Sequence, residues 1–319
     1  MRKPTSEGIV RAAAKVAEIL PMTPLLPIEF GERSCWIKAE SLQPIGAFKI
    51  RGAWNRITAI PVKDRARGVI GVSSGNHAQG VAWAARRLGI AATIVMPSDA
   101  PRIKLDNVRK LGAQIVEYER HVSDRDGIAR ELQAQTGATI VHAFADPWVI
   151  EGQGSIAIET RAQLAERGLP EPTRFIAPCG GGGLSAGLAL ACPEAEIVPV
   201  EPVGWDTIGR SMAAGTPLAS DAAAPRTICD CLLAPAAQEI NIDVLKHRAA
   251  PGLTVTDAEI RAAMRHLFAH ARLVVEPGAA AGVAAAMAGK APVDEGTVIV
   301  VTGGNVDPQL FSEIIGQDQ

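Results

Sequence analysis

Aromatic side chains are scarce in this chain of 319 residues, where phenylalanine, tryptophan and tyrosine together make up 4%. An excess of charge of one sign is also missing, because the formal net charge at pH 7 is only −2. Proteins that bind nucleic acids present basic side chains, often with aromatic rings between them. We therefore expect no nucleic-acid partner. The 47% hydrophobic content instead allows a sizeable core.

The cysteines show no pattern typical of a disulfide-linked or zinc-binding protein. There are five of them, an odd number, and no two are spaced as in a CxxC motif. This spacing excludes a disulfide scaffold and a zinc ribbon, and it predicts reduced thiols in the cytoplasm.

A targeting or membrane-spanning segment is also missing from the pattern. No basic start is followed by an apolar run and a small-residue cleavage site, so we expect no signal peptide. The alanine-rich stretch at residues 279–288 is too short, and too interrupted by glycine, to span a membrane. We expect no membrane partner.

What the sequence does contain is a regular alternation of strand and helix patterns, which favours parallel βαβ units. Strands are predicted at residues 34–39, 68–72, 92–96, 114–118, 139–141, 174–178, 196–200 and 297–301. Helices are predicted at residues 6–20, 76–88, 102–111, 123–135, 150–166, 183–191 and 256–271, and two more begin at Lys49 and Pro277. The region 204–251 reads as irregular. Two α/β domains with a site between them fit this pattern.

Lys49 stands near the start of its predicted helix, between Phe48 and Ile50. A single lysine is most often an exposed surface residue. In a partly dry pocket at the positive end of a helix, however, the ammonium form is disfavoured, and the neutral amine becomes a nucleophile suited to a Schiff base.

Two further stretches join a strand to a polar turn. Ser73, Ser74, Gly75, Asn76 and His77 lie where a buried strand turns into a helix. Small residues and free N–H groups at a helix start attract an anion such as a carboxylate, although an ordinary serine cap is the simpler alternative.

The second stretch ends the last strand, where Thr302 is followed by two glycines. A hydroxyl at this edge of a sheet can meet the ring of a ligand. A plain turn with two glycines is the alternative.

Four consecutive glycines, Gly180, Gly181, Gly182 and Gly183, follow the strand at 174–178 and open a helix. Ordering four glycines costs backbone entropy, which a nest of N–H groups around a phosphate would explain. The run also fits the loose dinucleotide fingerprint, since Glu201 follows at the end of the next strand. An NAD-dependent oxidoreductase therefore stays open as an alternative, as does a flexible glycine turn.

Taken together, these stretches resemble the fold type II pyridoxal-phosphate enzymes, in the branch of the serine/threonine dehydratases and serine racemases. Five segments carry the resemblance, and they occur in the order typical of that family. They are Ser41-x-Gln43-x-x-Gly46-Ala47-Phe48-Lys49-x-Arg51-Gly52-Ala53, then Ser73-Ser74-Gly75-Asn76-His77-Ala78-Gln79-Gly80, the four glycines, Glu276-Pro277, and Gly303-Gly304-Asn305-Val306-Asp307.

The resemblance implies an architecture and a set of roles. It implies two open-sheet α/β domains, as in the β subunit of tryptophan synthase, with pyridoxal 5′-phosphate in the cleft between them. Residues 1–67 and 146–319 would form the large, cofactor-binding domain, and residues 68–145 the small one. Relatives commonly form homodimers or larger assemblies, so a homo-oligomer is expected.

The roles implied for single residues follow from the same resemblance. Lys49 would hold the cofactor covalently and move the α-proton. Phe48 would flank the cofactor ring, Asn76 would bind its hydroxyl, Gly180, Gly181, Gly182 and Gly183 its phosphate, and Thr302 its ring nitrogen. Ser73, Ser74, Gly75 and His77 would grip the substrate carboxylate. Ser74 also matches the second proton-transfer serine of the racemases.

The implied reaction is a β-elimination, a lyase reaction of the EC 4.3.1 type in amino acid catabolism. The favoured substrates are L-threonine and L-serine, which would give a 2-oxo acid and ammonia. A specialised hydroxy amino acid is the next candidate: 3-hydroxyaspartate, phenylserine or an intermediate of compatible-solute breakdown. Serine racemization is the third.

Two positions depart from the family pattern. Cys231 stands where close relatives often carry glycine, which can narrow the pocket. The racemase cation site near Glu201 lacks its last acidic ligand, because Thr207 takes that place. We therefore expect no metal site.

Overall fold

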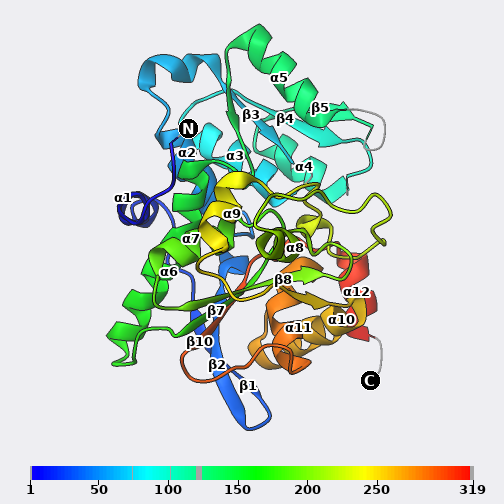
Figure 1. The fold of residues 1–319 in the computed structure, drawn as a ribbon. Helices are drawn as coiled ribbons and strands as arrows, with labels where there is room; N and C mark the ends of the chain where they lie inside the picture. Colours follow the sequence, from blue (N-terminus) through cyan, green and yellow to red (C-terminus); the bar gives the residue numbers. More distant parts are fainter. Residues whose placement is uncertain (1, 74, 101, 120–123, 317–319) are drawn as a thin grey trace.

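The computed structural model describes residues 2–73, 75–100, 102–119 and 124–316. Figure 1 shows two β-sheets, a four-stranded one above a six-stranded one, each with helices on both sides. Among the described residues, no helix has the length and apolar character needed to cross a membrane. The mixed α/β fold with two open sheets confirms the fold class that the sequence predicts.

The larger sheet has the strand order β1-β2-β10-β7-β8-β9, and its strands come from both ends of the chain. Only β1 runs antiparallel to its neighbour. The strands are β1 (Leu25–Phe30), β2 (Arg33–Ala39), β7 (Arg174–Pro178), β8 (Glu196–Pro202), β9 (Leu253–Val255) and β10 (Thr297–Val301).

The smaller sheet has the order β5-β4-β3-β6 and is parallel throughout. Its strands are β3 (Val69–Val72), β4 (Ala92–Pro97), β5 (Gln114–Tyr118) and β6 (Thr139–Val141). Because they all come from one continuous stretch, the chain leaves the larger sheet once and then returns to it. The boundaries of the two domains at 67/68 and 145/146 stay a prediction.

Helices cover both faces of each sheet. The smaller sheet packs against α2, α3 and α4 on one face and α5 on the other. The larger sheet packs against α1, α6, α7, α8 and α9 on one face and α10, α11 and α12 on the other. The helices are α1 (Ser6–Ala17), α2 (Lys49–Thr58), α3 (Asn76–Arg87), α4 (Arg102–Lys110), α5 (Arg125–Thr136), α6 (Pro147–Glu166), α7 (Gly183–Ala191), α8 (Thr207–Ala214), α9 (Glu239–Leu245), α10 (Asp257–His266), α11 (Ala281–Met287) and α12 (Pro308–Gly316).

Prolines account for two errors in the predicted strands. Residues 25–30 were not predicted as a strand, yet β1 includes Pro27, which is tolerated because β1 is the edge strand. Pro97 was expected to end its strand, but it belongs to β4 and pairs with Tyr118. The pairing of β3 with β4 ends at Val95, so the missing N–H of Pro97 faces no strand on that side.

The region 204–251 is less irregular than predicted. It contains the short helices α8 and α9 and a 3-10 turn at Asp230–Leu232. These helices have 8 and 7 residues, too few to show a hydrophobic period. Contacts with the rest of the fold support them, including two hydrogen bonds from the start of α8 to Glu201. The strand β9 and the helix α12 were not predicted either.

Candidate active site

One cavity of about 390 Å³ opens between the two sheets. Loops at the carboxyl ends of parallel strands of both sheets line it, which is where open α/β sheets bind ligands. Every predicted site residue that the structure describes lines this cavity. These are Phe48, Lys49, Ser73, Gly75, Asn76, His77, Gly180, Gly181, Gly182, Gly183 and Thr302. Ser74 lies outside the described residues.

Lys49 is the first residue of α2, as the sequence predicts. Its Nζ donates a hydrogen bond to the carbonyl oxygen of Ala143 at 2.8 Å and lies 5.1 Å from the centre of the Phe48 ring. Burial lowers the pKa of the amine from 10.5 to about 8, because a desolvated ammonium is disfavoured. Lys49 thus carries an amine that loses its proton far more readily than the amine of an exposed lysine.

The helix α3 holds the loop of Ser73 and His77 close to Lys49. Its residue Gly80 faces the start of α2, and a Cβ there would lie 3.1 Å from the carbonyl oxygen of Lys49. A side chain here would force the two helices apart by a few tenths of an ångström. Gly80 therefore lets α3 pack closely against the start of α2, and this packing places the loop and the amine in one cavity.

The side-chain amide of Asn76 is held from two sides. Its Nδ2 donates to Glu276 Oε1, and its Oδ1 accepts from Asn305 Nδ2 at 2.8 Å. Asn305 in turn donates to the carbonyl oxygen of Ile45. These bonds engage the amide oxygen and one N–H, and so leave the second N–H of Asn76 for a ligand. Glu276 and Asn305 both belong to family segments, but their contact with Asn76 was not predicted.

The four glycines form the turn between β7 and α7. Gly182 has φ +82°, a value that favours glycine, and Asn241 Nδ2 donates to the carbonyl oxygen of Gly181 at 2.6 Å. A Cβ at Gly181 would overlap the ring of Phe144. No side chain caps α7, and its first residues line the cavity. The turn therefore offers N–H groups to an anion.

Two histidines in the cavity wall are neutral. Burial, with a contribution from the charge of Lys49, lowers the pKa of His77 to about 3, and its Nε2 lies 2.8 Å from the carbonyl oxygen of Val141. Burial likewise lowers the pKa of His142 to about 4. His77 therefore presents a neutral ring and its backbone, and brings no positive charge into the cavity.

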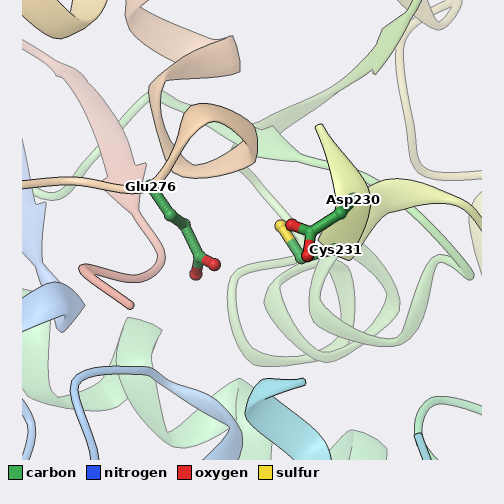
Figure 2. A group of neighbouring side chains, drawn as sticks. All are labelled: Asp230, Cys231 and Glu276. Carbon is green, nitrogen blue, oxygen red and sulfur yellow. The ribbon is translucent and has the colours of Figure 1, made fainter. Parts of the chain in front are cut away.

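A group of ionisable residues at the cavity wall was not predicted as a group. Lys104 Nζ lies 2.5 Å from Asp230 Oδ2 and 3.9 Å from Glu276 Oε2. Figure 2 shows Asp230 and Cys231 facing Glu276, and the ligand atoms of these three residues lie within 4.8 Å of one another. Carboxylates this close together can hold a cation, and here the ammonium of Lys104 is the cation beside them. Lys104 lies on α4 in a stretch without a recognisable motif, so nothing in the sequence indicated that it would meet Asp230 and Glu276.

Cys231 lines the cavity beside this group. Burial raises the pKa of its thiol well above 9, so the sulfur stays protonated. A Cβ at Gly278 would overlap Cys231 Sγ. Cys231 thus adds a neutral side chain to the cavity wall and relies on the missing side chain of Gly278 for its place.

Glu201 lies apart from the cavity. Its Oε1 and Oε2 accept hydrogen bonds of 2.9 Å from the N–H groups of Ile208 and Gly209, at the start of α8. The carboxyl group is fully buried, and burial raises its pKa to about 8. Because the carboxyl group is fully buried and does not line the cavity, it is not placed to bind the ribose of a dinucleotide. The structure argues against the dinucleotide alternative.

The fold and the cavity define a two-sheet α/β protein in which the amine of Lys49, a glycine turn at the start of α7 and the loop before α3 share one cavity. The chain belongs to the pyridoxal-phosphate dependent enzymes, whose family model matches residues 17–303. This confirms the resemblance seen in the sequence and identifies the cofactor as pyridoxal 5′-phosphate.

Three similar proteins show the branch of the family. A beta-hydroxyaspartate dehydratase of Paracoccus denitrificans is 36% identical over 313 residues, covering 95% of this chain and 97% of that protein. An L-threonine ammonia-lyase of Thermotoga maritima is 35% identical over 286 residues, covering 88% and 70%. The solved structure of maize serine racemase superposes with a TM-score of 0.90 at 32% identity, covering 98% and 97%.

The residues of the cavity fit this cofactor. Lys49 offers an amine whose pKa burial lowers to about 8. The uncapped start of α7 and the side-chain-free turn before it form a cradle of N–H groups for a phosphate. Asn76 keeps one N–H for a ring substituent, and Thr302 places a hydroxyl at the end of β10.

The lowered pKa of Lys49 has a measurable consequence for cofactor loading. Only the neutral amine attacks the cofactor aldehyde, so the attachment rate should rise with pH around the pKa of about 8 and level off only when the pH is well above that value. An ordinary exposed lysine would continue to gain neutral amine up to about pH 10.4. We expect the half-maximal rate near pH 8 when apoprotein is mixed with cofactor and the product is trapped with borohydride. A rate still rising steadily beyond pH 9.5 would contradict the assignment.

Proposed function

We propose that this chain catalyses the β-elimination of a small β-hydroxy amino acid, which yields a 2-oxo acid and ammonia. The observation that carries the proposal is one cavity in which the buried amine of Lys49, the loop of Ser73 and His77, and the hydroxyl of Thr302 lie together. When bound, pyridoxal phosphate withdraws electrons from the α-carbon of the substrate and so weakens the bonds to it.

In this proposal Lys49 takes the α-proton. Its amine is already mostly neutral slightly above pH 8, so it can accept a proton without first losing one. Ser73, Gly75 and the N–H groups at the start of α3 hold the substrate carboxylate, with Ser74 assigned to the same loop. This grip fixes the α-carbon beside the amine, and it contributes orientation rather than a new reactive group.

Thr302 favours elimination over other reactions of the family. A neutral hydroxyl that hydrogen-bonds a ring nitrogen does not impose a positive charge on it. The ring is then a milder electron acceptor, which suits the expulsion of a β-hydroxyl better than reactions that need strong electron withdrawal. Phe48 flanks the ring, Asn76 holds its hydroxyl, and Gly180, Gly181, Gly182 and Gly183 hold its phosphate.

L-Threonine and L-serine are the first proposed substrates. In the cavity wall the thiol of Cys231 is uncharged, and His77 and His142 are neutral. A neutral substrate side chain fits this balance. 3-Hydroxyaspartate is the second candidate, supported by the Paracoccus denitrificans dehydratase and by the presence of an ammonium group in the wall.

The test is the release of ammonia and 2-oxo acid from a panel of L-threonine, L-serine, threo-3-hydroxyaspartate and phenylserine. We expect kcat/KM for threonine or serine to exceed the others by at least about tenfold. A clear preference for 3-hydroxyaspartate would move the assignment to the second candidate. Interconversion of serine enantiomers without 2-oxo acid would replace elimination with racemization.

The cytoplasmic location and the homodimer or larger assembly stay predictions.

A further inference from the structure

Lys104 is a buried cation beside the loop that is proposed to hold the substrate carboxylate. It lies on α4 with only 4% of its surface exposed. A Cβ at Gly75 would lie 3.4 Å from Lys104 Nζ. The ammonium therefore lies beside the backbone of the loop at Gly75. Both residues line the cavity.

The ammonium is not fully engaged by its acidic neighbours. Within the described residues, the one hydrogen bond that Lys104 Nζ donates goes to Asp230, whereas a lysine has three N–H groups. Glu276 Oε2 lies 3.9 Å away and has no hydrogen-bond partner in the described parts of the chain, although Glu276 is 1% exposed. Lys104 thus keeps donors for another acceptor.

Other cations near the cavity are less suited to the loop. His77 and His142 are neutral, and the amine of Lys49 is assigned to the cofactor and the α-proton. The side chains of Arg125 and Arg130 are 30% and 65% exposed, and each pairs with an aspartate on or next to α5. Of the cations in the described cavity wall, Lys104 is the most buried one that contacts the loop.

We propose that Lys104 is a substrate-binding residue whose ammonium supplies the positive charge for the carboxylate of the amino-acid substrate at the loop of Gly75. This inference rests on the proposed function, because it uses the same substrate and the same loop. The ammonium pairs with Asp230 through one N–H and keeps further N–H groups for the substrate. Lys104 acts on binding and not on proton transfer, so its loss should appear mainly in KM.

The competing explanation is that Lys104 only joins the two halves of the molecule through its ion pair with Asp230. Lys104 belongs to a helix on the smaller sheet, and Asp230 to the region that follows β8 of the larger one. The two explanations differ for Asp230→Asn. That variant breaks the ion pair but keeps the ammonium, which is then free for a carboxylate.

The experiment compares the holoenzymes of Lys104→Gln, Lys104→Arg, Asp230→Asn and the control Lys110→Gln. We expect Lys104→Gln to raise KM by about 10- to 100-fold, the range of one charge-assisted hydrogen bond, with kcat changed far less. Lys104→Arg should recover part of the loss. Asp230→Asn should leave KM equal to or below the parental value. Lys110 is exposed on the same helix, so its variant should behave as the parent.

A binding measurement makes the test independent of turnover. L-Alanine carries the carboxylate but no leaving group, and ethylamine is the same molecule without the carboxylate. Calorimetry with the holoenzyme should show that Lys104→Gln weakens alanine binding by about 10- to 100-fold and leaves ethylamine binding unchanged. Failure of the whole substrate panel would overturn the proposed function while this comparison still decides the role of Lys104.

Two results would overturn the inference. One is a Lys104→Gln enzyme whose KM and alanine affinity stay within about threefold of the parent, because that is less than one charged hydrogen bond contributes. The other is an Asp230→Asn enzyme that loses as much affinity as Lys104→Gln, since the lost ion pair would then explain both. A Lys104→Gln protein that fails to fold leaves Lys104→Arg and Asp230→Asn to make the decision.

Discussion

Replacement of Lys49 by alanine is expected to lower kcat by at least about 10³-fold. The variant loses the amine that attaches the cofactor and also the group that takes the α-proton. Alanine leaves the cavity without any other neutral amine among the described residues, since Lys104 is held charged by Asp230 and Glu276, which raise its pKa. The measurement is 2-oxo acid release at saturating substrate, together with the mass of protein treated with borohydride.

The matched control is Lys63→Ala, which removes an exposed lysine from the 3-10 segment Val62–Arg67. This control should keep parental kcat and the borohydride-fixed cofactor. A Lys49→Ala protein that retains covalent cofactor, or more than a tenth of the parental kcat, would remove Lys49 from its assigned role. Circular dichroism of the variant should match the parent, because Lys49 makes only one hydrogen bond within the described residues.

Replacement of Arg51 by methionine is expected to lower the free energy of unfolding by about 3–5 kcal/mol. Arg51 is fully buried two residues after Lys49, and it grips both oxygens of Glu40 with hydrogen bonds of 2.7 Å. It also lies 2.9 Å from Glu159 Oε2. Methionine fills much of the same volume but leaves the buried carboxylate of Glu40 without its main partner.

The electrostatics of this pair support the expected size. Burial alone would raise the pKa of Glu40, yet Arg51 and Lys38 together hold it below its usual value. Removal of Arg51 therefore exposes the desolvation cost of the carboxylate. Urea unfolding monitored by tryptophan fluorescence should show the loss as a lower midpoint. The loosened start of α2 should also reduce kcat through the position of Lys49.

The control for this measurement is Arg109→Ala. Arg109 makes ion pairs too, but its side chain is 51% exposed and that of its partner Glu117 is 48% exposed. Exposed pairs contribute about 0–1 kcal/mol, because water solvates the separated charges well. Equal losses from Arg51→Met and Arg109→Ala would show that burial of the Arg51–Glu40 pair has no special weight in this fold.

Local sequence was sufficient for most of the elements. The strands β5, β6, β7 and β10 and the helix α7 have the predicted bounds, because hydrophobic period and turn residues are properties of a few consecutive residues. The same holds for the start of α2 at Lys49 and for the glycine turn before α7. The strand β1 was missed because a proline inside it looked like a break, and α8 because a helix of 8 residues is too short to show a hydrophobic period.

The sequence by itself therefore determined the α/β class, the cofactor family and the chain positions of the site residues. It did so because each motif is a short run whose chemistry depends on its own spacing. Only the tertiary structure decided which side chains surround these motifs. Lys104 and Glu276 come from unrelated parts of the chain, and they meet near Gly75 and Asn76 because two separate sheets face one cavity. The tertiary structure also set the pKa values of Lys49, His77 and Glu276. Burial is the largest cause of each shift, and burial is created only by folding.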